Sequence, residues 1–157
     1  MTTFLNGQMD SHLKAVLVFW RLSNPLPGCR AFSQFMRDDP RIDPAVLEER
    51  YGNLPDDPAA QNRLWYRIYK KHSSKTSIED VHRRFLLTRD LTSISLLFFP
   101  VLSIASFFLL KNYRTSFIYA GILMFVLLMQ CQSAKTYGAK FVRNVLAEES
   151  TVEVAVV

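Results

Sequence analysis

The chain has 157 residues, of which 19 are lysine or arginine and 14 are aspartate or glutamate, giving a formal net charge of +5 at pH 7. This length suits one or two small units, and so modest a charge excludes a basic nucleic-acid-binding arm. The two cysteines, Cys29 and Cys131, lie far apart and show no metal-ligand spacing. The sequence therefore predicts no disulfide, no metal and no cofactor, and a reducing compartment around Cys29.

The N-terminal segment contains a first predicted helix, which Asp10 and Ser11 cap and which runs to about Leu22. Its apolar residues recur at helical spacing, at Leu13, Val16, Leu17 and Trp20. The apolar run inside this helix is too short to span a bilayer, and no basic segment precedes it as in a signal peptide. We expect a buried segment or an in-plane contact with the membrane surface, with a buried strand as the alternative.

Prolines and aspartates divide the next part of the chain into short elements. The segment SNPLPG at residues 23–28 breaks any helix. Asp43, which precedes a proline, predicts the N-cap of a short helix that ends at Gly52 in a left-handed conformation. Asp57 repeats this signal and opens a second helix that is predicted to end near His72. One stripe of this second helix carries Trp65, Ile68, Tyr69 and His72.

A further helix is predicted from residue 78, with no stop signal before the first strongly apolar segment. Ser77 with Asp80 resembles a capping box that has the shorter acid in place of the usual glutamate. Two i, i+4 ion pairs support an exposed face, Glu79 with Arg83 and Asp80 with Arg84. The opposite stripe contains Ile78, Val81, Phe85 and Thr88. We therefore expect a stiff rod that couples the N-terminal part of the chain to the apolar segment.

Residues 91–110 and 115–134 are two runs of twenty residues without a single charge. At about 1.5 Å rise per residue, twenty helical residues span roughly 30 Å, the hydrocarbon thickness of a bilayer. Backbone amides in lipid must be satisfied within their own segment, so each run should be an α-helix. The sequence predicts an all-α membrane protein with a two-helix transmembrane hairpin, followed by a helix that returns to about residue 147 and a flexible or β-prone tail at 148–157.

Basic residues gather on one side of the predicted hairpin. The two charges in its loop are Lys111 and Arg114, whereas eight lysines and arginines flank the spans on the other side. The positive-inside rule then places both termini in the cytoplasm and the short loop outside. The flanking residues are Lys71, Lys75, Arg83, Arg84, Arg89, Lys135, Lys140 and Arg143. The residues expected at the membrane surface, near lipid head groups, are Lys70, Lys71, Lys75, Arg89, Lys135, Lys140 and Arg143.

The two spans contain a few polar or helix-breaking positions that are candidate functional residues. Pro100 lies in the middle of the first span and predicts either the hinge of a gated pore or, more commonly, a static kink. A face of small hydroxyl side chains predicts close helix packing or, in an oligomer, a water-facing wall. This face contains Thr92, Ser95, Ser103 and Ser106, with Phe99 between them. In the second span, Gln130 and Ser133 predict an inner vestibule or a hydrogen bond across the hairpin.

The cytoplasmic part contains one dense acid–base cluster. Asp39 and Asp43 directly precede prolines and Asp38 lies one residue further away, so turn and cap roles are favoured over metal binding or hydrolysis. No nucleotide-binding or nucleophile motif occurs, and we expect no enzyme activity. Basic and aromatic side chains are instead candidate contacts for a phosphate ligand or a partner protein. These candidates are Arg30, Arg41, Trp65 and Tyr69.

A cytoplasmic helix, a two-span hairpin with a tiny loop and a helix returning to the cytoplasm make up residues 78–147. This layout resembles the small two-transmembrane effectors of bacterial anti-phage systems, including SLATT-type proteins. The stretches NPLPGCRAFS, DDPRID and QNRLWYRIYKKH precede it and look like a distinct bacterial signature. In such effectors a sensor triggers oligomerisation and the hairpins breach the inner membrane, so the resemblance implies a regulatory or partner-binding role for residues 9–77.

The predicted organisation is a helical cytoplasmic domain at 1–77 and a long helix continuing into the hairpin and its returning helix at 78–147. Two spans cannot enclose a channel alone, so a pore would need a homo-oligomer. The first functional hypothesis is an oligomeric membrane-perturbing or pore-forming effector, which a cytoplasmic protein or small ligand controls. The second is a membrane-anchored adaptor that docks a cytoplasmic partner, and the third, weaker one is a membrane-bound hydrolase.

Overall fold

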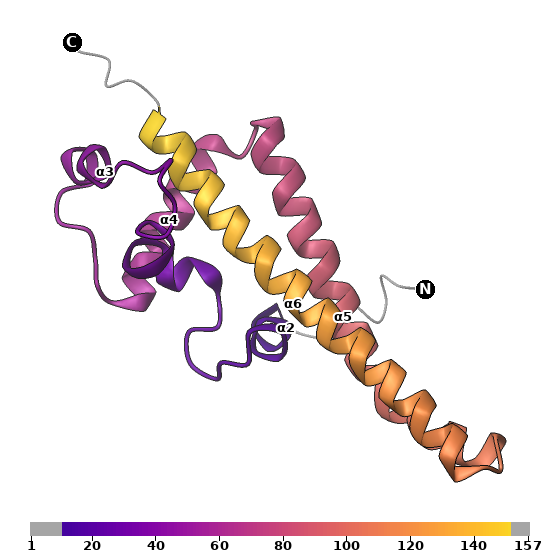
Figure 1. The fold of residues 1–157 in the computed structure, drawn as a ribbon. Helices are drawn as coiled ribbons and strands as arrows, with labels where there is room; N and C mark the ends of the chain where they lie inside the picture. Colours follow the sequence, from indigo (N-terminus) through magenta and orange to yellow (C-terminus); the bar gives the residue numbers. More distant parts are fainter. Residues whose placement is uncertain (1–10, 152–157) are drawn as a thin grey trace.

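The structure is a computed structural model that describes residues 11–151, and every regular element in this range is helical (Figure 1). The two long helices, α5 and α6, run side by side as an antiparallel pair, and the short helices gather on one flank of the pair, away from the loop that connects its two helices. This end of the pair and the short helices are predicted to lie in the cytoplasm and are named the cytoplasmic part after that prediction. The elements in chain order are α2 (Ser11–Phe19), the 3₁₀ helix η1 (Pro27–Arg30), the π-helical turn η2 (Ala31–Phe35), α3 (Pro44–Tyr51), α4 (Pro58–His72), α5 (Thr76–Leu109) and α6 (Tyr113–Thr151).

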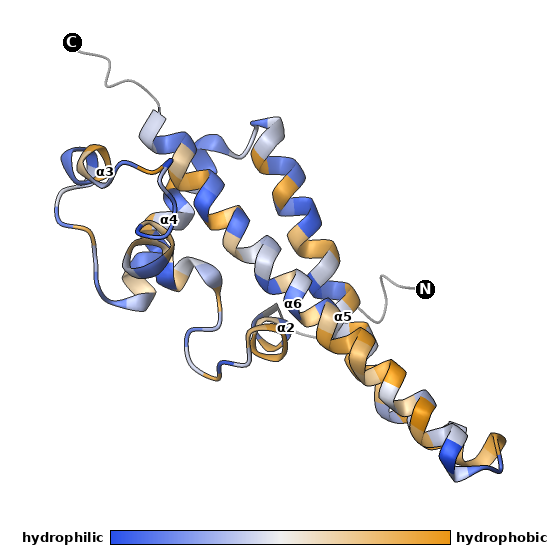
Figure 2. Ribbon diagram, in the orientation of Figure 1, coloured by the Kyte–Doolittle hydropathy of each residue, from blue (hydrophilic) through white to orange (hydrophobic). Residues whose placement is uncertain are grey.

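The prediction of an all-α fold with two apolar helices is confirmed. Both α5 and α6 contain a window that is long and apolar enough to cross a membrane. Figure 2 shows the apolar residues concentrated in the half of the helix pair that projects away from the short helices. The tight connection between the two helices lies at the tip, where Lys111 adopts a positive φ of 50°.

A single hydrophobic core joins the short helices to the cytoplasmic halves of α5 and α6. Trp65 of α4 packs edge-on against Phe141 of α6, with 5.1 Å between the ring centroids. Ile78 and Phe85 of α5 are buried in the same cluster. The rest of the core is drawn from η2, α3, α4 and α6, and includes Phe32, Leu47, Ile68, Val142 and Leu146. The long helices therefore form the scaffold of the cytoplasmic part as well as the apolar projection.

The aspartate–proline signals act as predicted. The Asp43 carboxylate accepts a hydrogen bond from the Ala45 amide at 2.9 Å, and Asp57 accepts one from the Ala60 amide at 2.8 Å. Each carboxylate satisfies one of the free amides of a helix start. Gly52 ends α3 with the predicted positive φ, at 71°, but its ψ of −153° differs from that of the predicted left-handed helical conformation.

One buried amide fixes η2, a segment whose sequence shows no clear pattern. The Gln61 side-chain oxygen accepts hydrogen bonds from the Phe32 amide at 3.1 Å and from the amide and hydroxyl of Ser33 at 3.2 Å each. Its amide nitrogen donates to the Asp56 carbonyl at 3.0 Å. Because Gln61 belongs to α4, this side chain ties the π-helical turn to the centre of the core.

Three boundary predictions are wrong. The first helix ends at Phe19 and does not reach Leu22, because Trp20 adopts a φ of 55° that takes the chain out of the helix. The capping box at Ser77 does not form: α5 already begins at Thr76, and no side chain caps it. Helix α6 continues to Thr151, beyond the predicted end near residue 147, so the predicted flexible tail is helical at 148–151. The rest of the tail and the Asp10 cap lie outside the described residues.

Candidate functional site

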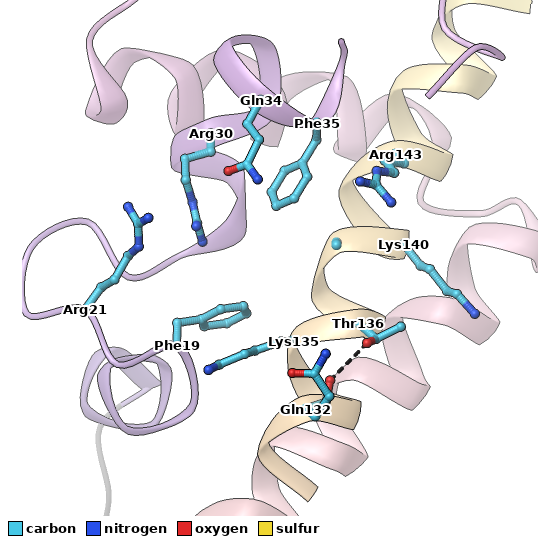
Figure 3. Close-up of a pocket in the computed structure, with 11 residues that line it drawn as sticks. Phe19, Arg21, Arg30, Gln34, Phe35, Gln132, Lys135, Thr136, Lys140 and Arg143 are labelled. Atoms are coloured by element: carbon cyan, nitrogen blue, oxygen red, sulfur yellow. Dashed lines mark hydrogen bonds between the residues drawn. The ribbon is translucent and has the colours of Figure 1, made fainter. Parts of the chain in front are cut away.

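A cationic cavity of about 480 Å³ lies between the end of α2, the η1–η2 turn and α6 (Figure 3). Its lining carries five basic residues and no acidic ones: Arg21, Arg30, Lys135, Lys140 and Arg143. In Figure 3, Arg21, Arg30 and Lys135 point into the space between these elements, whereas Lys140 extends away from it. Within residues 11–151 no carboxylate forms an ion pair with the four basic residues Arg21, Arg30, Lys135 and Lys140. The fifth, Arg143, pairs with Asp38 at 3.3 Å.

Phenylalanine rings hold the guanidinium groups at the back of this cavity. The Arg30 guanidinium lies 5.9 Å from the centroid of Phe19 and 5.6 Å from that of Phe35. Arg143 approaches Phe35 as well, at 5.5 Å. Cation–π contacts at these distances orient the groups, but they do not neutralise them. The Nε atoms of both arginines are buried and find no hydrogen-bond acceptor among the described residues.

The charge of Arg30 is therefore poorly compensated. Burial lowers the pKa of its guanidinium from the ordinary value, and the neighbouring charge of Arg21 lowers it further. Both effects disfavour the cation. An anion placed between Arg21 and Arg30 would stabilise the charged form of both side chains, so the cavity has the electrostatics of an anion-binding site.

An apolar cavity of about 380 Å³ lies on the hairpin side of the cationic one and shares no lining residue with it. Trp20 and Cys131 line it, whereas the next residue in each helix, Arg21 or Gln132, lines the cationic cavity. The Lys135 ammonium lies 5.0 Å from the centroid of the Trp20 ring, so this contact marks the boundary between the two. The other residues lining the apolar cavity are Val16, Leu17, Thr92, Leu96, Phe99, Met124, Leu127 and Leu128.

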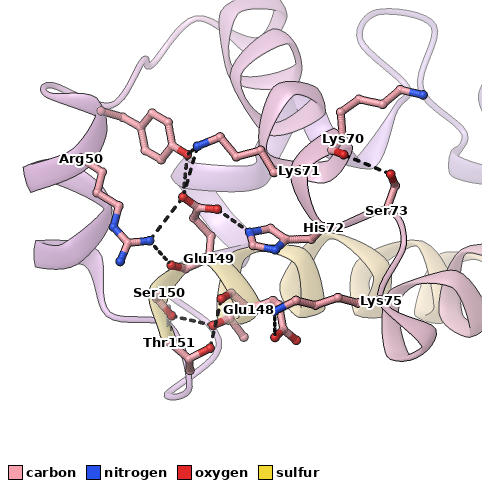
Figure 4. Close-up of polar contacts among 12 residues, drawn as sticks. Arg50, Lys70, Lys71, His72, Ser73, Lys75, Glu148, Glu149, Ser150 and Thr151 are labelled. Carbon is pink, nitrogen blue, oxygen red and sulfur yellow. Dashed lines mark hydrogen bonds and ion pairs between the residues drawn. The ribbon is translucent and has the colours of Figure 1, made fainter. Parts of the chain in front are cut away.

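A second cluster of charges closes the far end of the cytoplasmic part (Figure 4). The Glu149 carboxylate of α6 is buried and accepts hydrogen bonds from the Tyr51 hydroxyl at 2.7 Å and from the His72 ring nitrogen. Arg50 and Lys71 lie within 3.3 Å and 3.5 Å of the same carboxylate. Arg50 also donates to the Glu149 backbone carbonyl. One carboxylate thus links the ends of α3, α4 and α6.

The surroundings of Glu149 stabilise its ionised form. Burial by itself would raise the pKa of this carboxyl group, but the hydrogen bonds from Tyr51 and His72 and the charge of Lys71 outweigh burial. The pKa is therefore lower than its ordinary value of 4.5. At Asp39 the hydrogen bond from Arg41 lowers the pKa below its ordinary value of 3.8, against the opposing effect of burial.

We expect these two carboxylates to make the cytoplasmic part sensitive to acid. A folded-state pKa below the unfolded-state value contributes stability at neutral pH, and this contribution is lost as the pH falls through the folded-state pKa. The contribution of these two carboxylates to the free energy of unfolding of the detergent-solubilised protein should therefore stay level above pH 4.5 and fall below it. Chemical unfolding followed by the fluorescence of Trp65 measures this. Asp39→Asn should reduce the acid slope, and an unchanged slope would contradict the assignment of Asp39.

The candidate phosphate ligands of the sequence are not brought together. Arg41 lies outside the cationic cavity, where Nε and Nη2 donate to the two oxygens of Asp39 at 3.0 and 2.7 Å. Its Nη2 also donates to the Asn144 side chain at 3.1 Å. Of the two candidates, Arg30 alone faces the cavity. Each aspartate of the acidic cluster has a structural role: Asp39 pairs with Arg41, Asp38 pairs with Arg143, and Asp43 caps α3.

The aromatic candidates Trp65 and Tyr69 belong to the core. Their rings stack at 5.8 Å, and Trp65 is buried. The Tyr69 hydroxyl lies 3.1 Å from Nδ1 of His82, whose ring stacks on Phe141 at 4.7 Å. Burial, and then the charges of Arg89 and Lys70, lower the pKa of His82 and favour the neutral ring. This aromatic cluster holds α4 against α5 and α6.

The small hydroxyl side chains of the hairpin are mostly turned inward. Thr92 and Ser106 are buried, and their hydroxyls donate to their own helix, at the Thr88 and Ser103 carbonyls. Ser116 of α6 donates across the hairpin to the Ser106 carbonyl at 3.0 Å. Ser95 and Ser133 are half-buried, Pro100 is exposed, and Phe99 lines the apolar cavity. Ser103 Oγ and Gln130 Oε1 are buried and have no hydrogen-bond partner among the described residues.

The basic residues predicted at the membrane surface fall into two groups. Lys135 follows the second apolar run directly, and Arg89 precedes the first and pairs with Asp90 at 3.0 Å. Lys75 instead pairs with Glu148, and Lys71 with Glu149. About fifteen helical residues separate Lys75 from the first span, or roughly 22 Å of axial rise. We therefore place Lys70, Lys71 and Lys75 at the distal end of the cytoplasmic part, away from the level of Lys135, whose contact with lipid head groups stays a prediction.

Sequence reasoning missed the principal residues of both clusters. Glu149 was assigned to a tail, and Arg21 and Gln34 were not considered at all. No local pattern marks them, because their neighbours come from distant parts of the chain: the partners of Glu149 lie 77 to 99 positions away. A scan of protein-family models finds no match to the chain, and searches of curated proteins and of solved structures find none either. The resemblance to SLATT-type effectors stays a prediction.

Proposed function

We propose that this chain is an integral protein of the bacterial inner membrane in which cytoplasmic helices control a membrane-perturbing or pore-forming hairpin that acts as an oligomer. The observation that supports this most directly is the continuity of α5 and α6. Each helix runs without a break from the apolar projection into the buried core of the cytoplasmic part. A ligand or partner that changes the cytoplasmic packing would therefore act on both rods.

The exposure of the hairpin supports its insertion into a membrane. Only 17% of the apolar window of either helix is buried inside the chain. A core helix of a soluble protein would be mostly buried, and contiguous apolar surfaces of this size mark contacts with lipid or protein. The exposed side chains include Phe98, Ile104, Phe108, Phe117 and Phe125.

Two unsatisfied polar groups support a hairpin with more than one arrangement. Ser103 and Gln130 bury an oxygen each without a hydrogen-bond partner among the described residues. An unpaired buried polar group costs about 1–3 kcal/mol in a protein interior. An arrangement that gives both groups partners, across copies or to water in a pore, would recover this energy.

The adaptor is the second candidate, and the inward hydroxyl face favours it. Thr92, Ser106 and Ser116 already have their hydrogen bonds within one copy. A hairpin that satisfies these groups alone is a complete anchor, for which no second copy is needed. In this case the cytoplasmic part docks a partner protein and the membrane stays intact.

Liposome leakage together with copy number distinguishes the two candidates. The full chain, solubilised in mild detergent and reconstituted into dye-loaded liposomes, should form a complex of several copies and release the dye. A monomer or dimer that releases no dye would overturn the effector proposal and support the adaptor.

We expect Pro100→Ala to slow dye release by about tenfold, which corresponds to about 1.4 kcal/mol and is within the roughly 3 kcal/mol that a proline costs inside a helix. The alanine restores a backbone hydrogen bond and straightens α5 in the middle of the apolar run. Ile104→Val, at another exposed position of the same helix, should leave the rate unchanged. Equal rates for all three proteins would show that the proline is a static kink.

A further inference from the structure

We propose that the cationic cavity and the apolar cavity on its hairpin side form one binding site for an anionic phospholipid of the inner leaflet. The phosphate group would lie between Arg21, Arg30 and Lys135, and the start of an acyl chain would lie between α2 and the hairpin. This inference rests on membrane insertion of the hairpin, as proposed above, but on neither oligomerisation nor pore formation.

The phosphate end of the site is built from groups that already lack a counter-ion. Arg21, Arg30 and Lys135 point into the same space (Figure 3) and form no ion pair with a carboxylate of residues 11–151. The unpartnered Nε of Arg30 is buried, while Phe19 and Phe35 hold the guanidinium in place. A planar guanidinium that is oriented before binding suits the oxygens of a phosphate group.

The site lies at the depth of a lipid head group. Lys135 is the first charged residue after the uncharged run 115–134. Helix α2 is seen end-on in Figure 1 while α5 and α6 run across the view, so α2 lies crosswise to the hairpin at this level. If the hairpin crosses the membrane, α2 lies along its inner surface. Arg21 is the second residue after this helix and would face the head-group layer.

The acyl end of the site continues into the hydrocarbon layer. The apolar cavity is bounded by Leu17 and Trp20 on one side and by Phe99 and Leu128 on the other. Trp20 remains 68% exposed, although it is a large apolar residue held in a left-handed conformation that costs about 1–2 kcal/mol. An indole ring is favoured at the membrane interface, where one edge contacts lipid and the other contacts polar groups.

The position of the two cavities on either side of the Trp20–Lys135 contact favours a lipid over a soluble phosphate compound. Arg21 and Gln132 line the cationic cavity, whereas their chain neighbours Trp20 and Cys131 line the apolar one. Only an amphiphile with a negatively charged head would occupy both at once. A soluble phosphate would fill the first cavity and leave the apolar walls unused.

Binding to the detergent-solubilised full chain tests the proposal. Native mass spectrometry should show phosphatidylglycerol bound at least about tenfold more tightly than zwitterionic phosphatidylcholine, as expected when a charge-assisted contact of about 1.5–3 kcal/mol is gained. Glycerol phosphate at the same concentration should not bind measurably. If glycerol phosphate binds as tightly as phosphatidylglycerol, the ligand is a soluble phosphate and the lipid proposal is overturned.

The variants separate the two ends of the site. Arg21→Gln combined with Lys135→Gln should remove the preference for phosphatidylglycerol, and Arg21 is exposed, so its replacement leaves folding intact. Trp20→Ala should weaken phosphatidylglycerol several-fold. The matched control is Arg67→Gln combined with Arg63→Gln, at two exposed arginines of α4, which removes the same number of charges and should bind like the unmodified chain.

Unchanged lipid preference in the Arg21 and Lys135 variant would overturn the site. Equal loss in the Arg67 and Arg63 variant would overturn it too, because the preference would then follow net charge alone. A protein that remains in the membrane fraction but shows no preference would overturn this inference and leave the proposed function standing. A protein that dissolves without detergent would overturn both.

Discussion

Replacing Glu149 by alanine is expected to lower the free energy of unfolding of the cytoplasmic part by about 3–5 kcal/mol, the usual cost of removing one partner from a buried ion pair. Glu149 is only 4% exposed. Its removal leaves His72, Arg50 and Lys71 facing one another without the carboxylate that they share. The Tyr51 hydroxyl would lose its acceptor as well. Repulsion and lost hydrogen bonds act in the same direction.

The neighbouring glutamate provides a matched control. Glu148 pairs with Lys75 on the partly exposed rim of the same helix end. Glu148→Ala should therefore cost about 0–1 kcal/mol, as is typical of exposed ion pairs. The measurement is chemical unfolding in detergent, followed by the fluorescence of Trp65 in a Trp20→Phe background. Because Trp65 packs against Phe141 in the shared core, its signal reports the cytoplasmic part alone. Equal effects of the two alanine variants would contradict the role given to Glu149.

The expected loss at Glu149 also shows how the chain ends are coupled. The uncharged run of α6 ends just before Lys135, and the last turn of this helix is held against α3 and α4 through Glu149. A change that weakens these contacts would release the cytoplasmic end of α6. The other end of α6 forms one of the two helices of the hairpin. If the hairpin is the active part, Glu149→Ala should thus change dye release as well as stability.

Elements that depend on neighbouring residues were predictable from the sequence. Asp43 and Asp57 cap their helices, and Gly52 takes a positive φ, because each of these roles is decided within four residues. The ion pairs Glu79–Arg83 and Asp80–Arg84 form at 3.0 and 2.9 Å for the same reason. The apolar runs were long enough that no local exception could change their helical character.

The features that the sequence did not predict depend instead on contacts between residues far apart in the chain. Helix α2 ends early at Trp20, where contact with Lys135, more than a hundred residues away, accompanies an unfavourable backbone conformation. From the sequence alone, the last turn of α6 is predicted to be a charged tail, because its partners on α3 and α4 are distant in the chain. The candidate site shows the same limit: Arg30 was singled out, but Arg21 and Lys135 join it only through the tertiary fold. At Gly138 of α6, an added Cβ would lie 2.8 Å from the Phe19 ring. Helix α2 therefore packs closely against α6 at this glycine, and no local sequence pattern indicates that contact.

An arginine in the middle of the first span is expected to have opposite effects on a membrane hairpin and on a water-soluble one: it should weaken membrane partitioning of the first and should leave the second unharmed or more soluble. Val101 is 59% exposed in the isolated chain and lies at the centre of the run 91–110. In water, Val101→Arg at so exposed a position would be neutral or would improve solubility. In a bilayer, an arginine at the centre of a helix costs about 2.5–3.5 kcal/mol, or roughly a hundredfold in the partition between membrane and water.

We therefore expect Val101→Arg to shift most of the protein out of the carbonate-resistant membrane fraction, whereas Leu87→Arg should leave it there. Leu87 has the same exposed fraction of 59%, but it precedes the first span by one helical turn. The comparison holds exposure and the introduced charge constant and changes depth alone. If both variants behave alike, and the unmodified chain dissolves without detergent, the apolar faces of α5 and α6 would have to be covered by further copies of the chain. The proposed hairpin, its lipid site and its coupling to the cytoplasmic core would then all need to be abandoned, because each depends on one surface of these helices facing lipid.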